Sequence, residues 1–120
     1  MIALALAAMA QTATQAPCLK DGDTVEGEFR YVESRHPNGT RLRQPFVVTD
    51  TAFCFVPVLS PETSPVRGRW IQVHWTDPGT RPPAPGDGVT VVLGSCQEPM
   101  TAWHTGDIFC DARLVSRVTQ

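Results

Sequence analysis

Apolar and polar side chains alternate along several segments of this chain, and no stretch shows a sustained helical period. The clearest case runs through residues 24–33, where Val25, Gly27, Phe29 and Tyr31 alternate with threonine, glutamate and arginine. Such a pattern gives a strand one apolar face and one polar face. Eleven prolines and nine glycines add many turns and interrupt any long helix. The sequence therefore predicts an all-β domain.

The other expected strands are residues 44–49 with a continuation at 53–56, then 70–75, 89–93 and about 108–118. Asn38-Gly39 predicts a tight hairpin turn with positive φ angles after the first strand. Residues 57–69 and 76–88 are rich in proline and are expected to be loops. Five strands in a chain of this length favour a small Greek-key barrel of the oligonucleotide/oligosaccharide-binding (OB) type. A small β-sandwich or a partly open barrel is the alternative.

The first nineteen residues carry no charged side chain, and residues 2–9 are apolar. Ala8-Met9-Ala10 offers the small residues of a signal-peptidase site, so residues 1–16 are expected to be a signal peptide or a disordered segment. Residues 17–120 then form a single β-barrel domain, periplasmic or secreted. The apolar run is shorter than the roughly twenty residues that cross a bilayer, so no membrane span is expected.

Four cysteines fit an exported domain in which disulfides compensate for a small core: Cys18, Cys54, Cys96 and Cys110. None of their spacings is Cys-x-x-Cys, which argues against structural zinc and against a thioredoxin-type redox pair. Four cysteines allow three pairings, and their spacing alone does not choose among them.

Several short motifs resemble a family of small, exported, uncharacterised bacterial proteins. They are Cys18-Leu19, Val25-Glu26-Gly27, Cys54, the run from Gly88 to Gly94, and His104-Thr105-Gly106. The resemblance implies a barrel-like fold in which Cys18 pairs with Cys54 and Cys96 pairs with Cys110. It does not point to any particular activity. Geometry also favours the second pair, because the two cysteines would lie at the base of one loop if the last two strands are antiparallel.

In barrels of this type, ligands usually meet strands two and three and the loops joining strands one to two and four to five. These elements hold the candidate ligand-binding residues Arg35, His36, Arg41, Arg43, Trp70, His74, Trp103 and His104. Aromatic rings beside arginines suit stacking on sugars while cations hold anionic groups. The sequence thus favours a non-enzymatic binding module for a saccharide or an anionic polymer. A net charge of −2 argues against a general polyanion binder.

Two other functions are alternatives. The first is a protein-interaction module, such as an inhibitor that inserts the Trp103-His104 loop into a secreted hydrolase. The second is metal binding through His74, His104 and Asp107, although the preferred role of Asp107 is to accept backbone N–H bonds that fix its turn. No Gly-x-Ser-x-Gly turn is present, and the carboxylate pairs Asp21/Asp23 and Glu26/Glu28 are expected at solvated positions, so no catalytic residue and no cofactor is expected.

Overall fold

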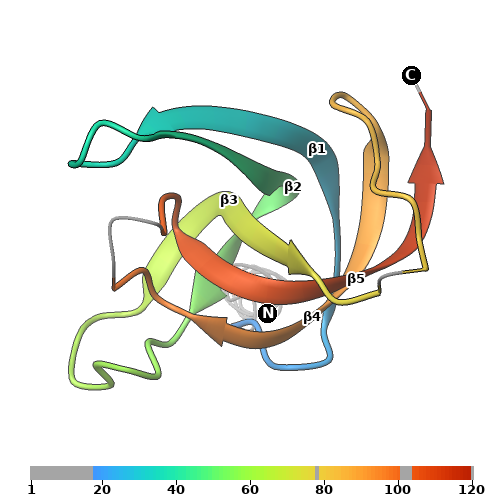
Figure 1. The fold of residues 1–120 in the computed structure, drawn as a ribbon. Coiled ribbons are helices and arrows are strands. Elements are labelled where there is room, and N and C mark those ends of the chain that lie inside the picture. Colours follow the sequence, from blue (N-terminus) through green and yellow to red (C-terminus); the bar gives the residue numbers. More distant parts are fainter. Residues whose placement is uncertain (1–17, 78, 101–103, 120) are drawn as a thin grey trace, which may run out of the picture.

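The computed structural model describes residues 18–77, 79–100 and 104–119, and there it is an all-β protein (Figure 1). Its five strands close into a barrel. In chain order they are β1 (Thr24–Arg35), β2 (Arg41–Phe55), β3 (Val66–Trp75), β4 (Gly88–Gln97) and β5 (Ile108–Val118). The expectation of a small five-stranded barrel is therefore confirmed against the sandwich.

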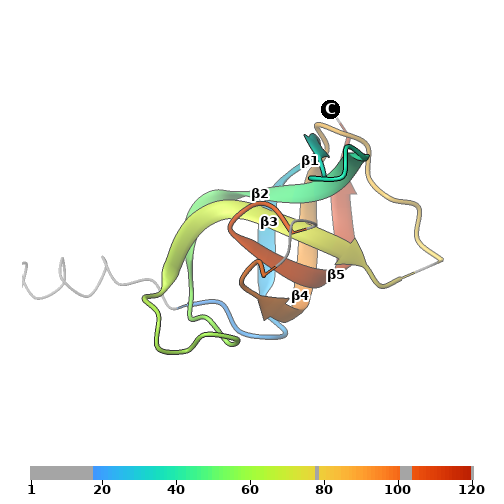
Figure 2. The same ribbon diagram turned by 60° about the vertical axis from the view of Figure 1, so that its left-hand side comes forward.

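The strands follow one another around the barrel in the order β1-β2-β3-β5-β4, and β4 returns to β1. Only β3 and β5 are parallel, and the other neighbouring pairs are antiparallel. The strongly curved β1 reaches both of its neighbours: β4 at its start and β2 along most of its length (Figure 2). The layout is that of an OB-like Greek-key barrel.

The interior is filled by the apolar residues that alternate along each strand. Those with no exposed surface include Phe29, Val47, Ile71, Val91 and Ile108, with one contributed by each strand. Burial of this apolar area is the main favourable term in folding. The alternation read from the sequence therefore marks the inward face of every strand.

Two disulfides hold the barrel, Cys18–Cys54 and Cys96–Cys110. The first ties the segment before β1 to the end of β2, and the second joins the neighbouring strands β4 and β5. Both expected pairings are confirmed. Disulfides of this kind persist in oxidising compartments rather than in the cytosol. In the described residues no helix is long and apolar enough to cross a membrane.

Two local expectations need correction. β3 begins at Val66 rather than residue 70, because its first residues pair with Phe53–Phe55 after a register shift in β2. The hairpin turn is wider than expected: it spans His36 to Thr40, and only Gly39 has a positive φ. Residues 1–16 lie outside the described residues, so the signal peptide stays a prediction.

The β1–β2 hairpin extends past the rest of the barrel. β4 pairs with β1 only from Thr24 to Glu28, and β3 pairs with β2 only from Phe46 onward. The hairpin itself continues to the cross-strand pair Arg35 and Arg41. We call residues 30–43 the arginine hairpin, since they contain four arginines and one glutamate. Figure 1 shows its teal end projecting beyond β3 and β5.

Candidate functional site

Residues 105–107, which directly precede β5 and which we call the strap, cross the outer face of the barrel formed by β2 and β3. The Thr105 N–H donates to Gln72 Oε1 at 2.8 Å, and the Thr105 hydroxyl donates to Gln44 Oε1 at 2.8 Å. The strap thus occupies the sheet face on which barrels of this type usually bind ligands.

Asp107 fastens the strap to β3. Its Oδ2 accepts the backbone N–H groups of Arg69 and Trp70, each at 3.0 Å, and its own N–H donates to the Trp70 carbonyl at 2.9 Å. The carboxylate fits because Gly68 has no side chain: a Cβ there would overlap it. Asp107 therefore accepts backbone N–H bonds as the sequence suggested, but from β3 rather than from its own turn.

The strap buries residues on the outer face of β2 and β3. Gln72 alternates with the inward-facing Ile71 and Val73, yet it is only 6% exposed. Phe46 is 1% exposed, and a Cβ on Gly106 would collide with its ring. Gly106 also has a φ of 92°, which favours glycine. The central part of this face is therefore closed by the chain itself.

Trp70 lies at the edge of the covered region and is half-buried. Its ring packs edge-on against Phe46 with centroids 5.9 Å apart. The Arg30 guanidinium lies over the indole at 5.6 Å and also pairs with Glu28. Trp70 is thus held by a packed aromatic contact on one side and a cation on the other.

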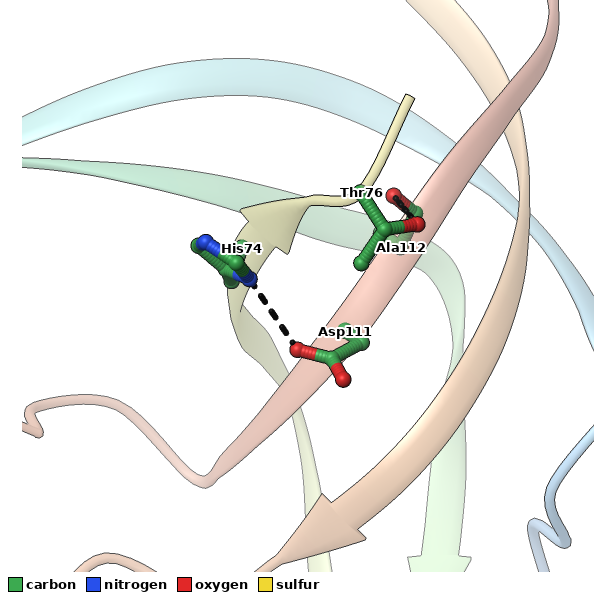
Figure 3. A network of polar contacts seen from close by, with 4 residues as sticks. All are labelled: His74, Thr76, Asp111 and Ala112. Carbon is green, nitrogen blue, oxygen red and sulfur yellow. Dashed lines mark hydrogen bonds and ion pairs between the residues drawn. The ribbon is translucent and has the colours of Figure 1, made fainter. Parts of the chain in front are cut away.

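His74 lies four residues further along β3, about 13 Å from Trp70 at strand spacing. Its Nδ1 is 3.2 Å from Asp111 Oδ1 on β5, as Figure 3 shows, and its side chain is 67% exposed. Thr76 directly follows β3, and its N–H donates to the carbonyl of Ala112 on β5 at 3.1 Å. His74 therefore belongs to a solvent-exposed pair on β3 and β5, away from Trp70.

His104 is half-buried, and its ring stacks on Phe109 with centroids 4.4 Å apart. Its Nδ1 atom is buried and has no hydrogen-bond partner among the described residues. Trp103 lies outside the described residues. Within the described part of the chain, no group of three or more histidine, cysteine, aspartate or glutamate side chains is placed to hold a metal ion.

The remaining candidates gather on the arginine hairpin. Arg35 and Arg41 are directly opposite each other, and Arg43 is opposite Glu33 on the same face of the hairpin. Like charges directly opposite on neighbouring strands destabilise a sheet. In the described residues no carboxylate lies within 4.0 Å of Arg35, Arg41 or Arg43. This face therefore carries an excess of positive charge: three arginines against Glu33, which lies opposite Arg43 but outside ion-pair distance.

Aromatic rings connect this face to the core. Phe29 packs against Trp75 at 5.7 Å and edge-on against Tyr31 at 5.0 Å, and the Arg43 guanidinium lies 4.1 Å above the Tyr31 ring. The row begins at a completely buried side chain and ends at an exposed cation. Arg43 is thus held in place before any ligand arrives. His36 lies in the turn, where its Nδ1 accepts the Asn38 N–H at 3.2 Å.

Glu98 is a structural residue that the sequence did not reveal. Its carboxylate is 8% exposed and accepts the N–H groups of Val58, Leu59 and Ser60 at 2.8 to 3.1 Å. Burial raises the pKa of Glu98, but these backbone hydrogen bonds outweigh it and lower the pKa below its ordinary value. Glu98 therefore fixes the loop after β2.

The structure divides the sequence candidates into separate groups. Arg35, His36, Arg41 and Arg43 come together on the arginine hairpin, whereas His74 lies on the β3–β5 surface and His104 packs beside the strap. Trp70 contacts the arginine hairpin through Arg30. Tyr31 was missed as a site residue because its place in an alternating strand marked it as part of the core.

No protein-family model matches the chain, and neither a curated protein nor a solved structure matches it.

Proposed function

We propose that this protein is a non-enzymatic, periplasmic or secreted module that binds an anionic polymer on its arginine hairpin. One observation carries the proposal: Arg35 and Arg41 oppose each other on the same face as Arg43, without a described carboxylate in ion-pair distance. This arrangement costs free energy in the unbound protein. Negative groups of a ligand relieve that repulsion when they bind.

The position of these arginines suits a polymer better than a small molecule. A shallow groove along the end of the hairpin is lined by Glu33, Ser34, Arg35 and residues 41–43. Small-molecule sites are usually enclosed and largely apolar. A protruding, open and cationic surface instead contacts several groups along an extended chain.

The experiment compares Arg35→Gln/Arg41→Gln with the wild type in binding to polygalacturonate and polyglutamate, with neutral dextran as the ligand control. The wild type binds both polyanions and releases them as salt rises. The double variant loses about tenfold in affinity, or 1.4 kcal/mol. Arg67→Gln/Arg113→Gln removes the same two charges from exposed positions on β3 and β5 and should leave the affinity unchanged. If the wild type binds neither polygalacturonate nor polyglutamate, the proposal is refuted.

A further inference from the structure

The two free edges of the arginine hairpin differ in their backbone. Along β1, the even-numbered residues from Glu28 to Ser34 direct their backbone groups to β2. The odd-numbered residues point the other way, as the bonds of Phe29 to Gly86 and Asp87 show. Tyr31, Glu33 and Arg35 continue this series past the end of β4. Their N–H and C=O groups have no backbone partner in the described part of the chain.

The β2 edge is interrupted. The backbone groups of its odd-numbered residues point toward the β3 side, because the even-numbered residues of β2 lie opposite those of β1 and bond to them. Pro45 is the next odd residue beyond the last β3 pair, and proline has no N–H to donate. The β1 edge therefore offers three donors and three acceptors in register, whereas the β2 edge begins with a missing donor.

We infer that the β1 edge from Tyr31 to Arg35 accepts an added strand from an acidic, extended polypeptide, so that the anionic polymer of the proposed function is a protein segment. This inference rests on the proposed function and names its partner class. Open strand edges pair with extended peptides through main-chain hydrogen bonds, and side chains supply specificity.

Charge identifies the partner as acidic. Arg35 lies on this edge and Arg41 directly opposite it on β2, and the hairpin carries four arginines against Glu33. Strand addition by a second copy would bring two hairpins of excess positive charge together. An acidic peptide instead gains ion pairs with Arg35 and Arg41 as its backbone bonds to β1.

The test uses an acidic peptide of about ten residues in which glutamate alternates with threonine, a residue that favours strands. Its partner probe has the same sequence and charge but carries N-methyl groups on two adjacent central residues, so that both peptide edges are blocked. We expect the methylated peptide to bind about tenfold more weakly. We also expect Tyr31, Glu33 and Arg35 amide protons to gain exchange protection with the unmodified peptide only.

A protein variant tests the same edge from the other side. Glu33→Pro removes an N–H that points away from β2, so the hairpin ladder is kept, and proline is tolerated on an edge strand. Glu33→Gln keeps the N–H and is the matched control. Glu33→Pro should lose the acidic peptide yet still bind polygalacturonate through its arginines, with an unfolding midpoint close to that of Glu33→Gln. The N-methylated peptide keeps the test decisive if Glu33→Pro fails to fold.

The outcomes separate the inference from the proposed function. Equal binding of the methylated and unmodified peptides would overturn strand addition and leave a charge-only polyanion site. Absence of binding to peptide and polygalacturonate alike would overturn both. A concentration-dependent dimer of the free protein that Glu33→Pro abolishes would assign the edge to a second copy and overturn the acidic partner.

Discussion

Asp107 and Gly68 depend on each other although they belong to different parts of the chain. The carboxylate takes the space that a side chain at residue 68 would need, and it satisfies two N–H groups of β3 before β5 begins to pair. A hydrogen-bonded carboxylate replaces a strand partner for these groups. The strap is therefore anchored by the Asp107 side chain, which fits only because residue 68 is glycine.

Asp107→Ala should destabilise the protein by about 1–3 kcal/mol, because two backbone donors lose their acceptor. Chemical denaturation measures this loss. Asp111→Ala removes an exposed carboxylate from the same strand region and should cost less than about 1 kcal/mol. In a double-mutant cycle, Gly68→Ala should cost much less once Asp107 is already alanine, since its Cβ then has room. If the losses in free energy of unfolding for Asp107→Ala and Gly68→Ala simply add, the two positions do not depend on each other.

Glu98 makes stability depend on pH in a defined direction. Its lowered folded pKa means that the folded state favours the carboxylate more than the unfolded state does. The stabilisation is therefore complete above the unfolded pKa of glutamate, about 4.3, and is lost as the pH falls through the folded value. Glu98→Gln should flatten this acid limb in unfolding curves measured from neutral pH downward.

The matched control for Glu98 is Glu62→Gln, because Glu62 lies exposed in the same β2–β3 loop. This variant should keep the acid dependence of the wild type. Equal acid limbs for Glu98→Gln and the wild type would show that the three loop N–H bonds do not hold the carboxylate in solution.

Among the elements, the arginine hairpin combines stiffness with electrostatic strain. The aromatic row from Trp75 to Tyr31 supports one face, while Arg35 and Arg41 repel each other across the strands. The hairpin also leaves the barrel where β3 and β4 no longer flank it. Its structure therefore depends on its own ladder and on this aromatic support.

Arg41→Gln should raise the free energy of unfolding by about 0.2–1 kcal/mol, because it removes one member of a like-charged cross-strand pair. The same change should weaken binding to polyglutamate. A gain in stability with a loss in affinity is characteristic of a surface kept for its ligand. Arg113→Gln provides the charge-matched reference, and equal stability of the two variants would remove the argument from repulsion.

At the scale of the whole molecule, the two disulfides differ in access. Cys110 is completely buried and Cys96 is 8% exposed, whereas Cys18 and Cys54 are both half-buried. A reductant has to reach a sulfur atom before exchange can begin. The barrel therefore protects the Cys96–Cys110 disulfide from reduction more than the Cys18–Cys54 disulfide.

Under native conditions, a mild reductant followed by alkylation should label Cys18 and Cys54 well before Cys96 and Cys110. Peptide mass spectrometry reads the order directly. Addition of denaturant should abolish the difference, because unfolding exposes all four cysteines. Simultaneous labelling in the native state would show that opening of the whole barrel precedes reduction of either bond.

The barrel could be predicted from the sequence because each strand has one face in a shared core, which leaves a period-two pattern. The first residues of β3 escaped this rule. Val66, Arg67 and Gly68 pair with β2, and Gly68 lies against Asp107, so tertiary contacts decide the conformation of this segment. The arginines were evident from their number, but their distribution between two faces required the strand register.

The strap could not be predicted from local pattern. Gln44 and Gln72 are polar residues at outer positions, and such residues normally meet water. They are buried because Thr105, distant in the sequence, provides their hydrogen-bond partners. The face of β2 and β3, which the sequence assigned to a ligand, is therefore covered by residues 105–107 of the same chain.

Pro45 makes the two edges of the hairpin unequal, and this difference affects whether copies of the protein assemble into fibres. A projecting hairpin with two open edges could pair with the next molecule on each side and so build an endless ladder, the route by which strand addition becomes fibre growth. Because Pro45 interrupts one edge, any strand that joins β1 finds no matching edge on the other side to extend the stack. One residue thus permits a single docking event while opposing polymerisation.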